Sequence, residues 1–377
     1  MALRIGIIGC GLIGRRRAAV AHEAGHRVVA VADLDAAKAA AVAQPSGAKP
    51  LSDWRWLVEK ADIEAVVVAT FNAALAPVTI ASLESGKHVL CEKPLGRNLA
   101  EAEQMVAAAR KAGRILKTGF NHRHHPAIWK ARELVRQGTV GPVMLIRAVY
   151  GHGGRPGYDK EWRANGELAG GGELLDQGVH ILDLCRWFMG DFAEAIALTG
   201  TFFWDLGCLP DAAAKFPQGQ RLEDNAFVLL RAKDGGIVQF HTSWTQWVNR
   251  FSFEVFGRAG CVAVEGLGGS YGTETLTVSR RRNEGGKPEQ EVEQFAGPDD
   301  SWRLEWQEFV SAISEGRQPL ANGQDGLETM KLVSALYESA RTGQAVNLKN
   351  AVEPTQRRKG AKDATISAAG CHYPLGE

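Results

Sequence analysis

Short apolar runs alternate with alanine-rich segments along the first 120 residues. The apolar runs predict strands at residues 3–8, 27–32, 65–69, 87–91 and 115–119. Helices are expected between them, and Gly25 and Gly86 stand where two of these helices end. Strands that alternate with helices pair in parallel, because each helix carries the chain back to the same end of the sheet. The pattern therefore predicts an α/β domain with a doubly wound parallel sheet.

After residue 121 the pattern changes to longer elements and then to consecutive strands. A helix at 126–137, a strand at 143–150, a glycine-rich loop and a long helix at 173–189 come first. Strands are then predicted at 196–203, 225–232, 237–247, 251–256 and 261–264, and helices at 302–315 and 327–342. Consecutive strands joined by tight turns pair antiparallel. We expect domains at residues 1–121 and 122–348, and a weakly ordered tail at 349–377.

Charge and cysteine content exclude several functional classes. The 44 Lys and Arg residues against 43 Asp and Glu leave a net charge of +1, which gives no field for nucleic acid or an anionic membrane. The longest apolar stretch, residues 63–83, is broken by Glu64, Asn72 and Pro77, so we expect no membrane span. The six cysteines form no CxxC pair, and no signal peptide pattern precedes the first strand. We expect a cytoplasmic protein.

A glycine motif, Gly9-Cys10-Gly11-Leu12-Ile13-Gly14, joins the first strand to the first helix. Asp33 ends the next strand, at the position where dinucleotide-binding folds place an acid. The glycines let the backbone approach a diphosphate at the helix N-terminus, and the Asp33 carboxylate suits the ribose hydroxyls while repelling a 2'-phosphate. The motif favours NAD over NADP. A flavin or an empty Rossmann fold stays open as an alternative, and at least two residues of Arg15–Arg17 are expected to be solvated.

The long helix at 173–189 carries an ionisable stripe. At 100° per residue, Asp176, His180, Asp183 and Trp187 fall on one face, while the rest of the helix is mostly apolar. Such a helix is buried, so the stripe should face a cavity or ionic partners. Either a catalytic Asp–His pair or one that merely stabilises the domain fits this pattern.

Three further segments, read together with the glycine motif, are similar to one family. They are Gly86–Pro94 with its Glu92-Lys93-Pro94 motif, Gly119–Pro126, and Asp176–Asp183 with an Asp-x-Gly-x-His-x-x-Asp pattern. The sequence resembles the glucose-fructose oxidoreductase / inositol dehydrogenase (Gfo/Idh/MocA) family from about residue 3 to 345. The resemblance implies a Rossmann domain followed by an α+β domain with a large, mostly antiparallel open sheet. It also implies a homodimer or homotetramer formed through that sheet.

The resemblance further implies roles for individual residues. Lys93, Asp176 and His180 would form the catalytic group, and Arg123 would belong to the substrate site. Thr70, Asn72, Glu92, Lys93 and Asn121 would join the glycine motif and Asp33 in binding the cofactor. The sequence departs from the family at Thr70–Leu75, where the Pro and His of a Thr-Pro-x-x-x-His motif are missing.

The chemistry of these side chains suits alcohol oxidation. His180 would act as the general acid or base, and Lys93 would stabilise charge on the reacting oxygen. Asp176 would either orient the imidazole or bind a neighbouring hydroxyl. The loop at 151–163 precedes this helix and is expected to line the substrate pocket. Tyr158 and Trp162 offer flat faces for a sugar or cyclitol ring, and Arg163 either binds an anionic substrate group or pairs with nearby acids. The histidines at 122–125 lack neighbouring ligands at metal spacing, so no metal is expected.

The sequence therefore predicts an NAD-dependent dehydrogenase or reductase acting on a sugar, sugar derivative or cyclitol. Two alternatives stay open. One is a glycosidase of the same family that uses NAD without net redox change, and the other is a non-catalytic NAD sensor. Net reduction of NAD separates the dehydrogenase from both.

Overall fold

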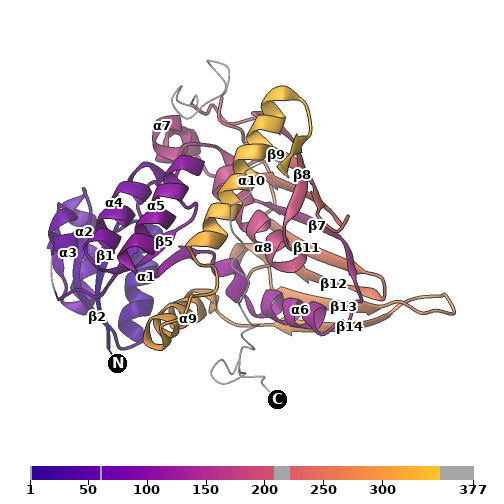
Figure 1. Ribbon diagram of the computed structural model, residues 1–377, viewed down its shortest axis with the longest axis horizontal. Helices are drawn as coiled ribbons and strands as arrows, with labels where there is room; N and C mark the ends of the chain where they lie inside the picture. Colours follow the sequence, from indigo (N-terminus) through magenta and orange to yellow (C-terminus); the bar gives the residue numbers. More distant parts are fainter. Residues whose placement is uncertain (1, 60–61, 208–220, 349–377) are drawn as a thin grey trace.

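The computed structural model describes residues 2–59, 62–207 and 221–348. Figure 1 shows a smaller sheet surrounded by helices on one side and a broad sheet on the other, with α10 (Gly323–Thr342) between them. The tail predicted at 349–377 lies outside the described residues. None of the helices in the described part is long and apolar enough to cross a membrane.

The N-terminal sheet is parallel and has the strand order β3-β2-β1-β4-β5-β6. Its strands are β1 (Arg4–Ile8), β2 (Arg27–Ala32), β3 (Lys49–Leu51), β4 (Ala65–Val68), β5 (His88–Glu92) and β6 (Leu116–Gly119). The helices between them are α1 (Leu12–Glu23), α2 (Ala36–Ala43), α3 (Arg55–Glu59), α4 (Asn72–Glu84) and α5 (Leu99–Ala112). The predicted doubly wound sheet is confirmed. The edge strand β3 was not predicted, because three residues give no periodicity.

The second sheet has nine strands in the order β14-β13-β12-β11-β7-β10-β9-β8-β15. These are β7 (Val143–Gly151), β8 (Phe192–Gly200), β9 (Asn225–Ala232), β10 (Ile237–Ser243), β11 (Arg250–Gly257), β12 (Gly260–Glu265), β13 (Glu274–Arg280), β14 (Glu289–Phe295) and β15 (Val346–Asn347). All neighbours pair antiparallel except β7 and β10, which run parallel. The strand β14 was not predicted, since it is mainly Glu and Gln and lies exposed at the edge of the sheet.

Among residues 2–59, 62–207 and 221–348, helices cover only one face of this broad sheet. The helices α6 (Pro126–Arg136), α8 (Val179–Met189) and α10 pack against it (Figure 1). In the part of the chain that the structure describes, no helix packs on the other face, which carries exposed apolar side chains of β8 and β9. After the sheet, α9 (Ser301–Glu315) returns to the first domain, where Trp306 and Phe309 join the core around β1 and β2. The chain thus crosses between the two domains more than once.

The helix predicted at 173–189 is not one continuous α-helix. It begins with a π-helical turn at Leu174–Gly178 (η5), and α8 continues from Val179. A π-turn holds an extra residue, so positions before and after it no longer follow 100° per residue. The predicted single stripe is therefore wrong: Asp176 faces Lys93, whereas Asp183 faces Arg123. π-turns are found mostly at functional sites, where they re-aim side chains.

Candidate functional site

One large cavity of about 890 Å³ lies between the two domains. The carboxyl ends of β1, β4 and β5 border it on one side, which is where doubly wound sheets bind ligands. The loop before α7 (Gly166–Ala169), the π-turn and α8 border it on the other side. The cavity therefore joins the glycine motif of the first domain to the predicted catalytic helix of the second.

The glycine motif fits a dinucleotide. Gly9 has φ +93°, and a Cβ there would lie 2.4 Å from the carbonyl oxygen of Ala69, so only glycine fits. A Cβ at Gly14 would lie 1.7 Å from the Gly9 oxygen, whereas one at Gly11 would have no heavy atom within 4 Å. Gly11 lines the cavity, and no side chain caps the N-terminus of α1. Free N–H groups thus remain at an open, positively polarised helix end that suits a diphosphate.

Asp33 lies at the rim of the same cavity. Its Oδ2 accepts a hydrogen bond from the Cys10 backbone N–H at 2.7 Å, and its Oδ1 accepts one from Asp35 N–H at 2.8 Å. These bonds fix the carboxylate at the end of β2. Each oxygen keeps a lone pair for a further donor, such as a ribose hydroxyl.

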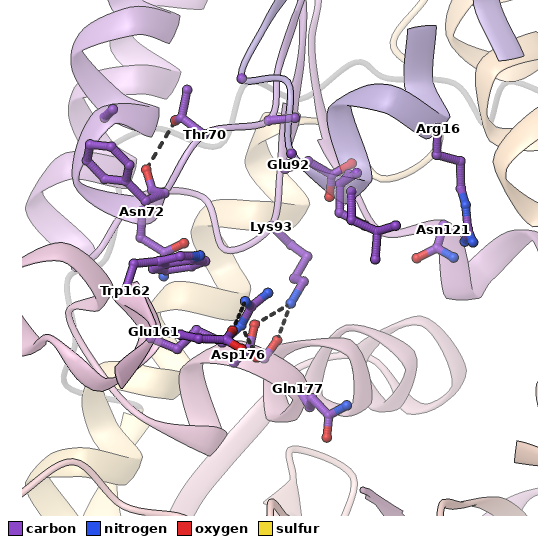
Figure 2. Close-up of a pocket in the computed structure, with 18 of the residues that line it drawn as sticks. Arg16, Thr70, Asn72, Glu92, Lys93, Asn121, Glu161, Trp162, Asp176 and Gln177 are labelled. Atoms are coloured by element: carbon purple, nitrogen blue, oxygen red, sulfur yellow. Dashed lines mark hydrogen bonds and ion pairs between the residues drawn. The ribbon is translucent and has the colours of Figure 1, made fainter. Parts of the chain in front are cut away.

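The other residues predicted to bind the cofactor all line the cavity, and their polar groups are largely held by the protein (Figure 2). The Thr70 hydroxyl donates to the Phe71 carbonyl at 3.1 Å. The Asn72 amide donates to the Ala169 carbonyl at 2.8 Å and so ties α4 to α7. The Asn121 amide donates to the Ser301 hydroxyl at 3.0 Å. These contacts shape the cavity wall and leave few free donors in this group.

Glu92 is held by Arg17, which is fully buried. Arg17 Nη2 lies 2.6 Å from a carboxylate oxygen of Glu92 and 2.6 Å from one of Glu305 on α9. Two neighbouring carboxylates raise the pKa of Arg17, although burial opposes this. Arg15 and Arg16 are exposed, as expected of two of the three arginines. Arg17 therefore anchors the segment just before Lys93 to both α1 and α9.

Lys93 and Asp176 meet across the domain boundary (Figure 2). Lys93 Nζ donates to Asp176 Oδ1 at 2.8 Å and to the Asp176 backbone carbonyl at 2.6 Å. Arg163 Nε donates to the other carboxylate oxygen at 3.1 Å. Burial would raise the pKa of Asp176, but Lys93 and Arg163 hold it well below its usual range. Two of the three Lys93 protons are thus committed to Asp176, and one remains for a ligand in the cavity.

His180 lies deeper in the cavity wall, one turn beyond Asp176. Its ring stacks on that of His122, with centroids 3.8 Å apart and planes at 24°. Burial lowers the pKa of His180 well below its usual 6.5, and the charges of Lys93 and His125 lower it further. The imidazole is therefore neutral near pH 7 and able to accept a proton.

Arg123, which was predicted to belong to the substrate site, is not among the residues that line the cavity. Its guanidinium is 3% exposed and makes two hydrogen bonds to Asp183, at 2.7 and 2.6 Å. It also pairs with Asp325 on α10 at 3.3 Å and lies over the Trp187 ring. Arg123 joins η2 (Asn121–His124), α8 and α10, which is a structural role.

The loop at 151–163 lines the cavity as predicted, through His152, Tyr158, Trp162 and Arg163 among others. Tyr158 is only 2% exposed, because its ring packs against Trp244 with centroids 5.1 Å apart. Its ring is therefore not a freely exposed flat face. Arg163 is paired with Asp176 and with Glu161, as one of the two sequence interpretations expected.

Sequence reasoning missed several residues of the cavity wall. His122 was considered only as part of a metal-like cluster, and Tyr150, Gln177 and Tyr271 were given no site role. For Gln177, the one signal in the sequence was that it directly follows Asp176. Tyr271 comes from a loop after β12 that only the sheet topology brings to the site.

Comparison with known proteins identifies the family. Residues 3–120 match the oxidoreductase family with an NAD-binding Rossmann fold, and residues 128–263 match the GFO/IDH/MocA C-terminal domain. The chain is 32% identical to the 1,5-anhydro-D-fructose reductase of Ensifer adhaerens, across 92% of this chain and 98% of the reductase. The chain belongs to the Gfo/Idh/MocA family of oxidoreductases. The predicted family, the NAD-binding Rossmann domain and the fold class are thereby confirmed.

Other Gfo/Idh/MocA proteins match along nearly the whole chain. The inositol 2-dehydrogenase of Rubrobacter xylanophilus is 27% identical, across 95% of this chain and 96% of that enzyme. A levoglucosan dehydrogenase solved in complex with NADH and L-sorbose shares the fold, with a TM-score of 0.82 at 24% identity. That match covers 92% of this chain and 99% of the solved one.

Proposed function

We propose that this member of the Gfo/Idh/MocA family oxidises or reduces one carbon of a sugar, sugar derivative or cyclitol with NAD or NADH. The observation that carries the proposal is the contact of Lys93 with Asp176 at 2.8 Å, in the cavity that also holds the glycine motif and His180. The reductase and dehydrogenase named above act on compounds of this class, which supports the same class here.

Each side chain has a role that follows from its contacts. NAD, when bound, supplies the hydride acceptor for the oxidation. His180, being neutral, takes the proton of the substrate hydroxyl. The free N–H of Lys93 donates to the same oxygen and stabilises its growing negative charge. Asp176 fixes Lys93 through two oxygens, and Trp162 and Arg163 border the space left for the substrate ring.

The test is the formation of NADH by the purified protein with NAD and a panel of inositols, aldoses, uronates and UDP-sugars. Growth of NADH absorbance with one class of substrate is the expected result. If NAD binds but no substrate changes its redox state, the dehydrogenase proposal fails and the redox-neutral glycosidase or sensor takes its place.

We expect NAD to be preferred over NADP, because the fixed Asp33 carboxylate repels a 2'-phosphate. The ratio of kcat/KM should favour NAD by at least about tenfold, which corresponds to about 1.4 kcal/mol. Asp33→Asn, which removes the charge and keeps the shape, should reduce this ratio. Asp35→Asn is the control, since Asp35 caps α2 and does not line the cavity. Equal use of both cofactors by the wild type would contradict the assignment.

We also propose a homodimer or homotetramer formed through the open face of the broad sheet. Ile196, Leu198, Phe227 and Leu229 lie on adjacent strands β8 and β9 and are 38–67% exposed. An apolar patch of this kind on a soluble protein marks an interaction surface. Light scattering should give two or four times the mass of one chain. Leu198→Asp combined with Phe227→Asp should give a monomer, and a monomeric wild type would refute the proposal.

A further inference from the structure

The start of the π-turn is held by one residue far away in the sequence, Glu223. Its carboxylate accepts hydrogen bonds from the backbone N–H groups of Gly172, at 3.2 Å, and of Leu174, at 3.0 Å. Its backbone carbonyl accepts the N–H of Glu173 at 3.0 Å. The first N–H groups of a helix have no partner within it. Here three successive N–H groups donate hydrogen bonds to a single residue, Glu223, which lies just before β9.

The contact is close and buried. Glu223 is 4% exposed, and its Oε1 also accepts the hydroxyl of Tyr337 on α10 at 2.8 Å. A Cβ at Gly172 would lie 2.0 Å from the Glu223 carbonyl oxygen, and one at Gly171 would lie 2.3 Å from the Tyr337 hydroxyl oxygen. Only glycines let the chain approach this closely, which explains two of the three glycines at 170–172. This part of the predicted glycine-rich loop is therefore tightly packed.

The same segment carries the reacting groups. Asp176 follows Leu174 by two residues, and its N–H donates to the Gly172 carbonyl at 3.0 Å. Asp176 in turn accepts Lys93, and His180 lies one turn further on. A shift of Gly172 or Leu174 would therefore move the Asp176 carboxylate and the His180 ring together. Displacements of about 1 Å at a reacting group lower rates by as much as ~100-fold.

We propose that Glu223 is a positioning residue for the reaction. Its oxygens accept hydrogen bonds from the N–H groups at the start of the π-turn, and Tyr337 in turn donates to its carboxylate. These contacts fix the positions of Asp176 and His180 relative to Lys93. The inference rests on the proposed function, because it assigns these three residues to the reaction. It adds a residue that touches neither the cofactor nor the substrate.

Glu223→Gln tests the proposal with little change of shape. The amide has one acceptor oxygen where the carboxylate has two, so an NH₂ group would face one of the backbone N–H donors. We expect kcat to fall about tenfold or more, while the dissociation constant of NADH changes less than about twofold. Burial raises the pKa of Glu223 to about 7. Assays at roughly pH 8.5 therefore compare the ionised wild type with the variant.

Two further variants test whether the loss of kcat is specific to the Glu223 contacts. Tyr337→Phe removes one donor to Glu223 and leaves both backbone contacts, so a loss of kcat within about threefold is expected. Glu308→Gln is the matched control, because Glu308 also accepts a backbone N–H, that of Leu320 at 2.8 Å, but lies away from the cavity. Its kcat should equal that of the wild type. Unchanged kcat in folded Glu223→Gln, or an equal loss in the control, would overturn the proposal.

Amide hydrogen exchange supplies a readout that does not depend on turnover. Exchange at residues 172–180 should be faster in Glu223→Gln than in the wild type and unchanged in the control. If the Gln variant does not fold, Glu223→Asp, which keeps the charge and retracts the carboxylate, should show the same local change. If exchange at residues 172–180 is faster in Glu223→Gln but the wild type turns over no substrate, only the proposed function is refuted. Full activity of the variant would refute the positioning role alone.

Discussion

Replacing His180 with alanine is expected to lower kcat about 10²- to 10⁴-fold, the range measured for loss of a general base. The ring is neutral because burial and the charges of Lys93 and His125 lower its pKa, so it can take the hydroxyl proton. Affinity for NADH should change little, since the diphosphate and ribose contacts lie at the glycine motif and Asp33. Steady-state kinetics and titration of NADH fluorescence measure the two effects separately.

His22→Ala serves as the control, because His22 is an exposed residue of α1 outside the cavity. Its kcat and NADH affinity should match those of the wild type. Turnover of His180→Ala within about tenfold of the wild type would show that the proton leaves by another route. A large loss of NADH affinity would place His180 in the cofactor site instead.

Replacing Arg17 with methionine is expected to destabilise the fold by about 3–5 kcal/mol, the cost of removing one partner from a buried ion pair. Arg17 is 0% exposed and pairs with Glu92 and Glu305. Methionine fills part of the space but leaves both carboxylates buried beside each other, with Lys117 3.6 Å from Glu305 as a remaining cation. The midpoint and slope of urea unfolding, followed by circular dichroism, give the loss.

The loss of stability in Arg17→Met should be smaller at low pH. Unpaired buried carboxylates have a raised pKa in the folded state, so they take up protons and cost less as pH falls. Arg55→Met is the control, since the exposed pair of Arg55 with Asp53 is screened by solvent and should contribute little to stability. An equal loss in the two variants would mean that the Arg17 network does not stabilise the fold beyond an ordinary surface pair.

The parts of the site that were predicted from sequence are those fixed by local backbone chemistry. Gly9, Gly14 and Asp33 follow from a strand, a tight turn and a helix that are adjacent in the chain. Lys93 follows from its place at the end of a parallel strand. Each of these positions depends on only a few neighbouring residues, so the pattern of residue types is enough to predict it.

The features that the sequence did not predict depend on contacts between distant segments. Arg123 has the same chemistry whether it faces a substrate or a carboxylate, and only the packing of η2 against α8 and α10 puts Asp183 and Asp325 beside it. The stripe of four residues assumed a regular α-helix, and the π-turn breaks that period. Glu223 lies about 50 residues from the N–H groups that it receives, and no local pattern connects them.

The sequence by itself determined the family and the NAD-binding Rossmann motif, because those features reside in short motifs whose geometry is local. It also predicted Lys93, Asp176 and His180 as the reacting side chains. The tertiary structure decided which charged side chains are paired within the protein and which keep a free hydrogen-bonding group for a ligand. It commits two protons of Lys93 to Asp176, pairs Arg163 and Arg123 with carboxylates, and stacks His122 on His180. The physical reason is that an ion pair or a stack depends on distance in space. The fold sets that distance by packing elements that the chain separates by tens or hundreds of residues.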